Sequence, residues 1–203
     1  MCGIIGYIGG KPAVPYLLEG LRRMEYRGYD SAGVAVQFDG ALGTRRAAGK
    51  IARLESALAD APLDGSCGIG HTRWATHGPP TERNAHPHLS KDGTVAVVHN
   101  GIIENANALR ALLTGKGYEF RSDTDTEVIA HLVQELLDGS LEDAVMAALR
   151  EVDGTYGLAI MSSRDPGKIV AARKGSPLLV GIGEGEHFLA SDASAILAHT
   201  RQV

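Results

Sequence analysis

The second residue of the chain carries two groups that could act in nucleophilic catalysis. If Met1 is removed, Cys2 has both a thiol and a free α-amine. The ordinary pKa of an α-amine, about 7.7–8.0, is close to neutral pH, where a general base works best. Cys2 would then supply nucleophile and base together, and Gly3 would leave room for a substrate beside the thiol. The alternative is a small buried residue at the start of a strand.

Two possible oxyanion-stabilising donors follow a strand-like run at residues 94–99. The Asn100 side-chain amide and the Gly101 N–H could both donate to a developing oxyanion. The alternative is a tight hairpin turn, because Asn-Gly suits such turns. The second cysteine, Cys67, lies between Ser66 and Gly68 within a predicted strand, and we assign it to packing.

Two charged residues could together recognise an amino acid. Arg73 could bind a carboxylate through two hydrogen bonds, although a surface salt bridge is its ordinary role. Asp125, in the acidic run before an apolar helix, could bind an ammonium group, and the same run could cap that helix. The two roles are compatible, because one acid can cap while the other binds. Trp74 is either a core anchor or a lid on a glycine-flanked loop.

Composition excludes several classes of function. Net charge is −4 without a basic run, which argues against nucleic-acid binding and against an anionic membrane surface. No apolar run approaches the roughly 18 residues that span a bilayer, and no basic residue precedes the apolar start, so we expect a cytoplasmic protein. The eight histidines show no metal-ligand spacing and the glycines no phosphate-loop spacing, so we expect no metal and no cofactor.

Periodicity predicts short strands and amphipathic helices that fall into groups, which indicates an α+β layered fold of one domain. Strands are predicted at 3–8, 33–38, 42–47, 67–71, 94–99, 156–161, 169–172, 178–183 and 187–190. Helices are predicted at 13–24, 105–113, 125–137, 141–151 and 193–198, and a further one is marked by Ile51, Leu54 and Leu58 and ends before Pro62. Residues 72–92 lack clear periodicity and hold three prolines, which is typical of a functional loop.

Several ordered motifs resemble those of one enzyme family. They are MCGI at 1–4, EYRGYDSAG at 25–33, HTRWATHG at 71–78, NAHPH at 84–88, HNGIIEN at 99–105 and TDTEVIAH at 124–131. Together they are similar to the glutaminase domain of the glutamine–fructose-6-phosphate aminotransferases, which are class II amidotransferases. The resemblance covers essentially the whole chain, residues 1–203.

The resemblance implies a fold, a reaction and a set of roles. The fold is that of the N-terminal nucleophile hydrolases, with four αββα layers and two stacked antiparallel sheets. The reaction is hydrolysis of L-glutamine to L-glutamate and ammonia through a thioester on Cys2. The implied roles are an oxyanion hole at Asn100 and Gly101, support of the site by Arg27, binding of the substrate carboxylate by Arg73 and of its ammonium by Asp125, a gate at Trp74, and pocket lining by Thr76 and His77.

In complete members of this family, the ammonia passes to sugar-isomerase domains of the same polypeptide, where it converts fructose 6-phosphate to glucosamine 6-phosphate. Because nothing follows Val203, we expect this chain to be the glutaminase domain alone and the full-length enzyme to be a homo-oligomer. Three alternatives stay open: a non-catalytic glutamine- or glutamate-binding fragment that keeps Met1, the glutaminase domain of another class II amidotransferase, and a metal-dependent amidohydrolase.

Overall fold

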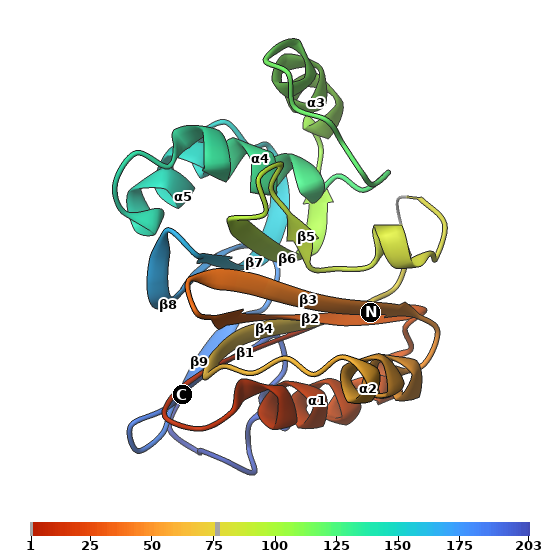
Figure 1. The fold of residues 1–203 in the computed structure, drawn as a ribbon, viewed down its shortest axis with the longest axis vertical. Helices are drawn as coiled ribbons and strands as arrows, with labels where there is room; N and C mark the ends of the chain where they lie inside the picture. The colour runs from red at the N-terminus through yellow and green to blue at the C-terminus, as the bar shows by residue number, and fades with distance from the viewer. Residues whose placement is uncertain (1, 76–77) are drawn as a thin grey trace.

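The computed structural model describes residues 2–75 and 78–203, and in them the strands form two antiparallel sheets stacked between layers of helices (Figure 1). Helices α1 (Ala13–Arg23) and α2 (Ile51–Asp60) cover the outer face of the first sheet. Helices α4 (Glu127–Leu136) and α5 (Leu141–Arg150) cover the outer face of the second, and α3 (Ala106–Gly115) packs against α4. The expected αββα order of layers is confirmed.

The first sheet places the chain's start at its centre. Its strand order is β3-β2-β4-β1-β10-β9. The strands are β1 (Gly3–Ile8), β2 (Ser31–Phe38), β3 (Ala41–Ala48), β4 (Cys67–Arg73), β9 (Leu179–Ile182) and β10 (His187–Ala190). Strand β1 pairs with β4 on one side and with β10 on the other, and Cys2 directly precedes its first residue.

The second sheet has the order β5-β6-β7-β8. It comprises β5 (His88–Leu89), β6 (Val95–Ile103), β7 (Gly154–Ser162) and β8 (Asp165–Lys174). Short 3₁₀ turns η1 (Glu25–Arg27), η2 (Glu82–Asn84) and η3 (Ala193–Ala195) lie in the connections. Helix α5 begins as its sequence predicts, because the Ser140 side chain accepts a hydrogen bond from the Asp143 N–H.

Alternation along the strands explains the layers. In β1, Ile5 and Tyr7 point into the core beneath α1 and α2, whereas Ile4 packs between the sheets. In β6, Val95 and Val97 face the helices of the other side, and Ala96 and Val98 face the first sheet. Strands of both sheets are therefore apolar on both faces, as burial between two layers requires.

Two predicted elements differ from the structure. Strand β6 continues through Asn100 and Gly101 to Ile103, so the hairpin interpretation of Asn-Gly is wrong. The ladder with β7 continues over this stretch, pairing Asn100 with Gly157, and these pairings outweigh the turn preference. The predicted helix at 193–198 is only the 3₁₀ turn η3.

Candidate active site

A pocket of about 460 Å³ opens where the N-terminal end of β1 meets β6 of the other sheet. Most of the residues predicted to form the site line it: Cys2, Arg27, Arg73, Trp74, Asn100, Gly101 and Asp125. They come from five separate parts of the chain, which the two sheets bring together. The predicted pocket residues Thr76 and His77 lie outside the described residues.

The Cys2 thiol is held against the segment that follows β4. The backbone N–H of Trp74 donates to Sγ at 3.2 Å, and Sγ lies 3.7 Å from the carbonyl oxygen of the same residue. Burial raises the pKa of the Cys2 thiol, although the Trp74 hydrogen bond and the charge of Arg73 oppose the shift. The thiol is therefore protonated at neutral pH, and a nucleophilic role requires a base that removes this proton.

Gly3 was expected to leave room for a substrate beside the thiol, and this expectation is wrong. A Cβ at Gly3 would lie 2.8 Å from Thr72 Oγ1 and 2.9 Å from Met24 Sδ. Gly3 does not line the pocket, so its missing side chain makes room for the packing of α1 against the sheet and not for a substrate.

Asn100 and Gly101 lie on β6 beside Cys2. The Asn100 Nδ2 donates to the Cys2 carbonyl oxygen at 3.4 Å, and its Oδ1 lies 2.9 Å from Nε2 of His71. Gly101 has a φ of +138°, and a Cβ there would collide with the carbonyl oxygen of Thr155 on β7. Only glycine fits this position without displacing the neighbouring strand.

Arg27 binds the backbone of the candidate nucleophile. Its Nη1 donates to the Cys2 carbonyl oxygen at 3.5 Å, and its Nη2 forms a mostly buried ion pair with Asp192. Burial opposes ionisation of Asp192, but hydrogen bonds from Tyr26 and Ser194 and the charge of Arg27 lower its pKa to about 2. The carboxylate thus fixes the guanidinium against the start of β1.

The motif at residues 25–33 also supports the segment after β4. A Cβ at Gly28, whose φ is +74°, would lie 2.9 Å from the Trp74 ring, so the glycine lets this ring approach closely. The Asp30 side chain accepts a hydrogen bond from the Ala75 N–H. The Trp74 side chain itself is 53% exposed, so the interpretation of this residue as a core anchor is wrong.

Arg73 and Asp125, the two residues predicted to recognise an amino acid, are both held by hydrogen bonds to the backbone. Arg73 is only 4% exposed, which excludes a surface salt bridge, and it donates to the Gly78 and Pro79 carbonyl oxygens at 3.3 and 3.4 Å. The Asp125 carboxylate accepts from the Ile103 N–H at 2.8 Å and does not cap α4, whose N-cap is Thr126. Both charged groups line the pocket.

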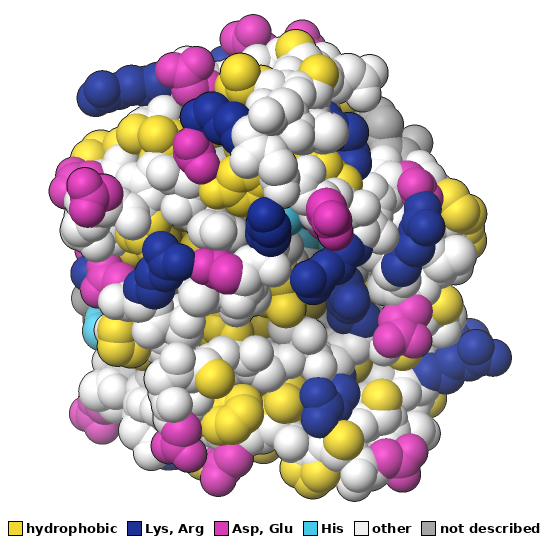
Figure 2. Space-filling model, turned by 45° about the horizontal axis from the view of Figure 1, so that its top comes forward, with side chains coloured by type: hydrophobic (Ala, Val, Ile, Leu, Met, Phe, Trp, Pro, Cys, Tyr) yellow, Lys and Arg dark blue, Asp and Glu magenta, His cyan; other side chains and the backbone are white. Residues whose placement is uncertain are grey.

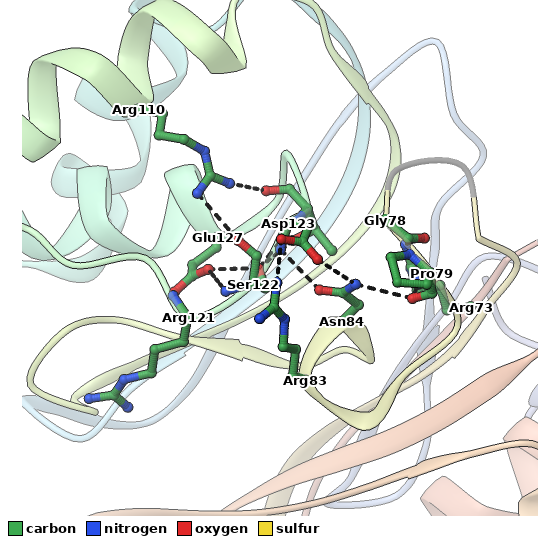
Figure 3. Close-up of polar contacts among 11 residues, drawn as sticks. Arg73, Gly78, Pro79, Arg83, Asn84, Arg110, Arg121, Ser122, Asp123 and Glu127 are labelled. Carbon is green, nitrogen blue, oxygen red and sulfur yellow. Dashed lines mark hydrogen bonds and ion pairs between the residues drawn. The ribbon is translucent and has the colours of Figure 1, made fainter.

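A polar network joins the loop after Arg73 to the loop before Asp125 (Figure 3). Asn84 donates to the Pro79 carbonyl oxygen and to the Asp123 carboxylate, each at 3.1 Å, and accepts from the Asp123 N–H at 2.9 Å. Arg110 on α3 donates to the Thr124 carbonyl oxygen at 2.7 Å. The two loops are therefore fixed relative to each other.

The same network ends on a buried carboxylate. Glu127, at the start of α4, accepts from the backbone N–H groups of Arg121 and Ser122 at 2.8 and 2.6 Å (Figure 3). Burial disfavours ionisation of Glu127, but these bonds and His131 lower its pKa to about 2. Glu127 is therefore ionised, and its carboxylate fixes the backbone of the loop that leads to Asp125.

Four histidines are buried at or next to the pocket: His71, His86 and His99 line it, and His88 lies against His86. The sequence drew attention to the histidines only as possible metal ligands. Burial lowers the pKa of His71 and His88 to about 3 and that of His86 well below its usual range, so these rings are neutral. They come from β4, β6, β5 and the loop before β5, so no periodic pattern in the sequence predicts that they lie together. In residues 2–75 and 78–203, no set of three or more His, Cys, Asp or Glu side chains could hold a metal ion.

The face shown in Figure 2 carries mixed charge. Basic and acidic side chains alternate there and no large field of one sign forms. Over the parts of the chain that the structure describes, no helix has both the length and the apolar character needed to cross a bilayer.

Comparison with known proteins identifies the family of the chain. The family model of the glutamine amidotransferase domain matches residues 71–198. The chain is 56% identical over its whole length to the glutamine–fructose-6-phosphate aminotransferase (isomerizing) of Clostridium acetobutylicum, and 53% identical to that of Thermus thermophilus. It covers 33% of each of these relatives, so it spans about a third of their length.

Solved structures give the same fold. The allosteric regulatory enzyme of purine biosynthesis matches 98% of this chain with a TM-score of 0.86 and 28% identity, over 44% of its own chain. The glutamine phosphoribosylpyrophosphate amidotransferase of B. subtilis matches 98% with a TM-score of 0.82 and 27% identity, also over 44%. With the family match over most of its length, the chain belongs to the glutamine amidotransferase domain family.

Proposed function

We propose that this chain hydrolyses the side-chain amide of L-glutamine to L-glutamate and ammonia, with Cys2 as the nucleophile once Met1 is removed. One observation carries the proposal. The Cys2 thiol opens into a pocket that also presents an amide donor, a buried arginine and a carboxylate. These groups match the reacting amide and the two charged ends of an amino acid.

The reaction would proceed in two stages, formation of a thioester on Cys2 and hydrolysis of that thioester. Cys2 Sγ attacks the amide carbon while its proton passes to the α-amine of the same residue, and Asn100 Nδ2 and the Gly101 N–H stabilise the oxyanion. The carbon–nitrogen bond then breaks, the α-amine returns the proton to the leaving group, and ammonia departs. Water next attacks the carbonyl carbon of the γ-glutamyl thioester and gives one proton to the α-amine. The carbon–sulfur bond then breaks, the α-amine returns that proton to Sγ, and glutamate is released.

The α-amine is the best base available to the thiol. Within the described residues, the hydrogen-bond partners of Sγ are backbone groups of Trp74 and not a histidine. The low pKa values of His71 and His88 also make these rings poor proton acceptors at neutral pH. A terminal amine one bond from the Cys2 Cα needs no other residue to position it.

Substrate recognition would use the two ends of the pocket. Arg73 would bind the glutamine carboxylate and Asp125 its ammonium, with Arg27 supporting the Cys2 backbone. Thr76, His77 and Trp74 would complete the pocket, as the family resemblance implies. The network through Asn84 and Asp123 supports this assignment, because it holds the two recognition loops at a constant separation.

We further propose that the ammonia serves the synthesis of glucosamine 6-phosphate from fructose 6-phosphate on sugar-isomerase domains of a longer, homo-oligomeric, cytoplasmic enzyme. The named relatives support this acceptor: they are 53–56% identical to this chain, against 28% for the purine-biosynthesis enzyme. The chain covers only 33% of those relatives, which leaves room for such domains.

The proposal is tested by covalent labelling with a diazoketone analogue of glutamine. We expect one adduct per chain, on Cys2, and loss of both the adduct and glutaminase activity in Cys2→Ala. Cys67 provides the control, because it is 5% exposed and burial raises its pKa to about 11, so Cys67→Ala should be labelled and active like the wild type. Labelling of Cys67, or activity in Cys2→Ala, would contradict the proposed nucleophile.

A further inference from the structure

We propose that His71 is a positioning residue for glutamine hydrolysis, which sets the orientation of the Asn100 side-chain amide so that its NH₂ group faces Cys2. The inference rests on the proposed function, because it concerns the oxyanion donor of that reaction. His71 lies on β4 of the first sheet and Asn100 on β6 of the second, so their contact crosses the interface between the sheets.

The hydrogen bond between the two side chains defines the orientation. His71 Nε2 lies 2.9 Å from Asn100 Oδ1, and Asn100 Nδ2 lies 3.4 Å from the Cys2 carbonyl oxygen. When Nε2 carries a proton, it donates to the amide oxygen and leaves both amide protons for the Cys2 side of the pocket. The opposite amide orientation would present an oxygen to the developing oxyanion and would repel it.

Burial selects the tautomer of His71 that this orientation requires. The residue is 1% exposed, and its Nδ1 is buried without a hydrogen-bond partner among the described residues. A proton on Nδ1 would leave a buried N–H unsatisfied, whereas a proton on Nε2 meets the Asn100 oxygen. Burial also keeps the ring neutral, since it lowers the pKa of His71 to about 3.

The His71 ring is itself fixed from two sides. In the first sheet, His71 pairs with Ile4 of β1 and Gly33 of β2, so its backbone is held on both edges. Its ring stacks on His86 with centroids 4.2 Å apart and an angle of 19° between the planes. His86 Nδ1 in turn accepts a hydrogen bond from the N–H of His99 at 3.2 Å, directly before Asn100.

A rigid donor on a rigid strand is what a positioning role requires, because small displacements of a catalytic group are costly. The Asn100 backbone is held separately: its carbonyl oxygen accepts from Ser176 Oγ at 3.1 Å, and β6 pairs with β7 at this residue. Rotation of the side-chain amide is thus the freedom that remains at Asn100. The shorter of its two side-chain contacts is the one with His71, at 2.9 Å, against 3.4 Å to the Cys2 carbonyl oxygen.

The test compares His71→Leu, which removes the donor, with His71→Gln, which keeps an N–H donor on a side chain of similar reach. In His71→Leu we expect kcat for glutamine to fall by up to about 100-fold with little change in KM. His71→Gln should recover a large part of kcat. His71→Phe, which keeps a ring for the His86 stack but no donor, makes the same comparison if the leucine variant does not fold.

Two further readouts separate positioning from a general structural role. Alkylation of Cys2 by iodoacetamide, a displacement that forms no oxyanion, should proceed at the wild-type rate in His71→Leu. In an Asn100→Ala background, His71→Leu should cause no further loss of kcat, because the group it orients is gone. Parallel loss of alkylation and turnover, an undiminished effect in the Asn100→Ala background, or an unchanged kcat in His71→Leu would each overturn the proposal.

Failure of this inference is distinguishable from failure of the proposed function. If the Met1-free wild type does not hydrolyse glutamine, the proposed function is wrong and the His71 comparison has no basal rate to alter. If the wild type is active and labelled on Cys2 while His71→Leu turns over at the same rate, only the positioning role is wrong.

Discussion

Cys2 combines a protonated thiol, a backbone carbonyl held by two donors and a position at the end of a central strand. The carbonyl oxygen accepts hydrogen bonds from Arg27 Nη1 and Asn100 Nδ2. Both residues therefore lie close to a substrate that reacts with the thiol. Because burial raises the pKa of the thiol, the proposed nucleophilic role would depend on a neighbouring base more than on spontaneous ionisation. We therefore predict that substitutions of the residues around the thiol have separable effects on turnover and on substrate binding.

Asn100→Ala should lower kcat by roughly 100- to 1000-fold, because its amide interaction strengthens as the oxyanion forms. KM should change little, and the diazoketone analogue should still bind competitively against glutamine. Steady-state hydrolysis of glutamine measures both constants. A rise in KM with unchanged kcat would show that Asn100 binds the ground state instead.

Arg73→Ala should raise KM for glutamine by roughly 10- to 100-fold, since a charge-assisted hydrogen bond to the substrate is lost. Arg23→Ala is the matched control: this arginine pairs with Glu19 on the exposed side of α1, and its loss should leave kcat and KM unchanged. Initial rates over a wide range of glutamine concentrations distinguish the two. An unchanged KM in Arg73→Ala would remove this residue from substrate recognition.

Among the elements, β6 does most to organise the site. It continues past the point where Asn-Gly would ordinarily turn, and so carries Asn100 and Gly101 into the pocket while remaining paired with β7. The network of Asn84, Asp123 and Glu127 similarly fixes the loop before α4. Precision at the site thus comes from extended strands and from loops that are hydrogen-bonded to one another.

Gly101→Ala should abolish glutaminase activity and destabilise the protein, because the added Cβ would collide with the Thr155 carbonyl oxygen at a φ that disfavours alanine. Gly115→Ala is the control: it lies in α3, and a Cβ added there would meet no atom within 4 Å, so stability should be equal or slightly higher. Thermal unfolding and turnover check both. An active, equally stable Gly101→Ala would contradict the glycine requirement.

The sequence predicted the elements well where periodicity was strong and local. The predicted strands at 33–38 and 42–47 are joined by the turn at Asp39-Gly40, with φ of +46° and +73°, and the predicted helix at 141–151 begins at the Ser140 cap. These elements depend on near neighbours and are confirmed. Two results depend on distant partners and were missed: the extension of β6 through Asn100, which follows from β7, and the ion pair of Arg27 with Asp192.

The motifs in the sequence pointed to most of the candidate site residues. They did not reveal the residues that position those side chains. The proposed role of His71 depends on its contact with Asn100, which crosses from one sheet to the other. The close packing of Gly28 against Trp74 depends on two loops that are far apart in the sequence. Neither relation leaves a periodic or spacing signal in one sequence. Long-range contacts are the information that local patterns lack.

For the whole molecule, three buried histidines, His71, His86 and His88, link stability to pH. Burial holds their folded-state pKa values below the unfolded value of about 6.5, so the unfolded chain binds more protons below that pH and stability is lost on acidification. Glu127 acts in the same direction at lower pH, since its pKa of about 2 lies below that of an unfolded glutamate. Full stability from both sources is present above about pH 6.5.

Between pH 6 and pH 4.5, the free energy of unfolding should therefore fall, with a slope of up to about 4 kcal/mol per pH unit from three buried histidines. Urea titrations at several pH values measure this slope. His88→Gln should reduce it, whereas substitution of the exposed His187 by Gln should not. A free energy of unfolding that stays constant to pH 4.5 would contradict the neutral, buried state of these rings.

The proposed mechanism depends above all on a free α-amine at Cys2 that activates the thiol of the same residue. Its sharpest test is glutamine turnover by two samples of the same chain, one shown by sequential N-terminal degradation to begin at Cys2 and one shown to keep Met1. We expect turnover in the first and at least about 100-fold slower turnover in the second, since the base is then an amide nitrogen. Equal rates in the two samples, or an inactive sample that begins at Cys2, would contradict this mechanism.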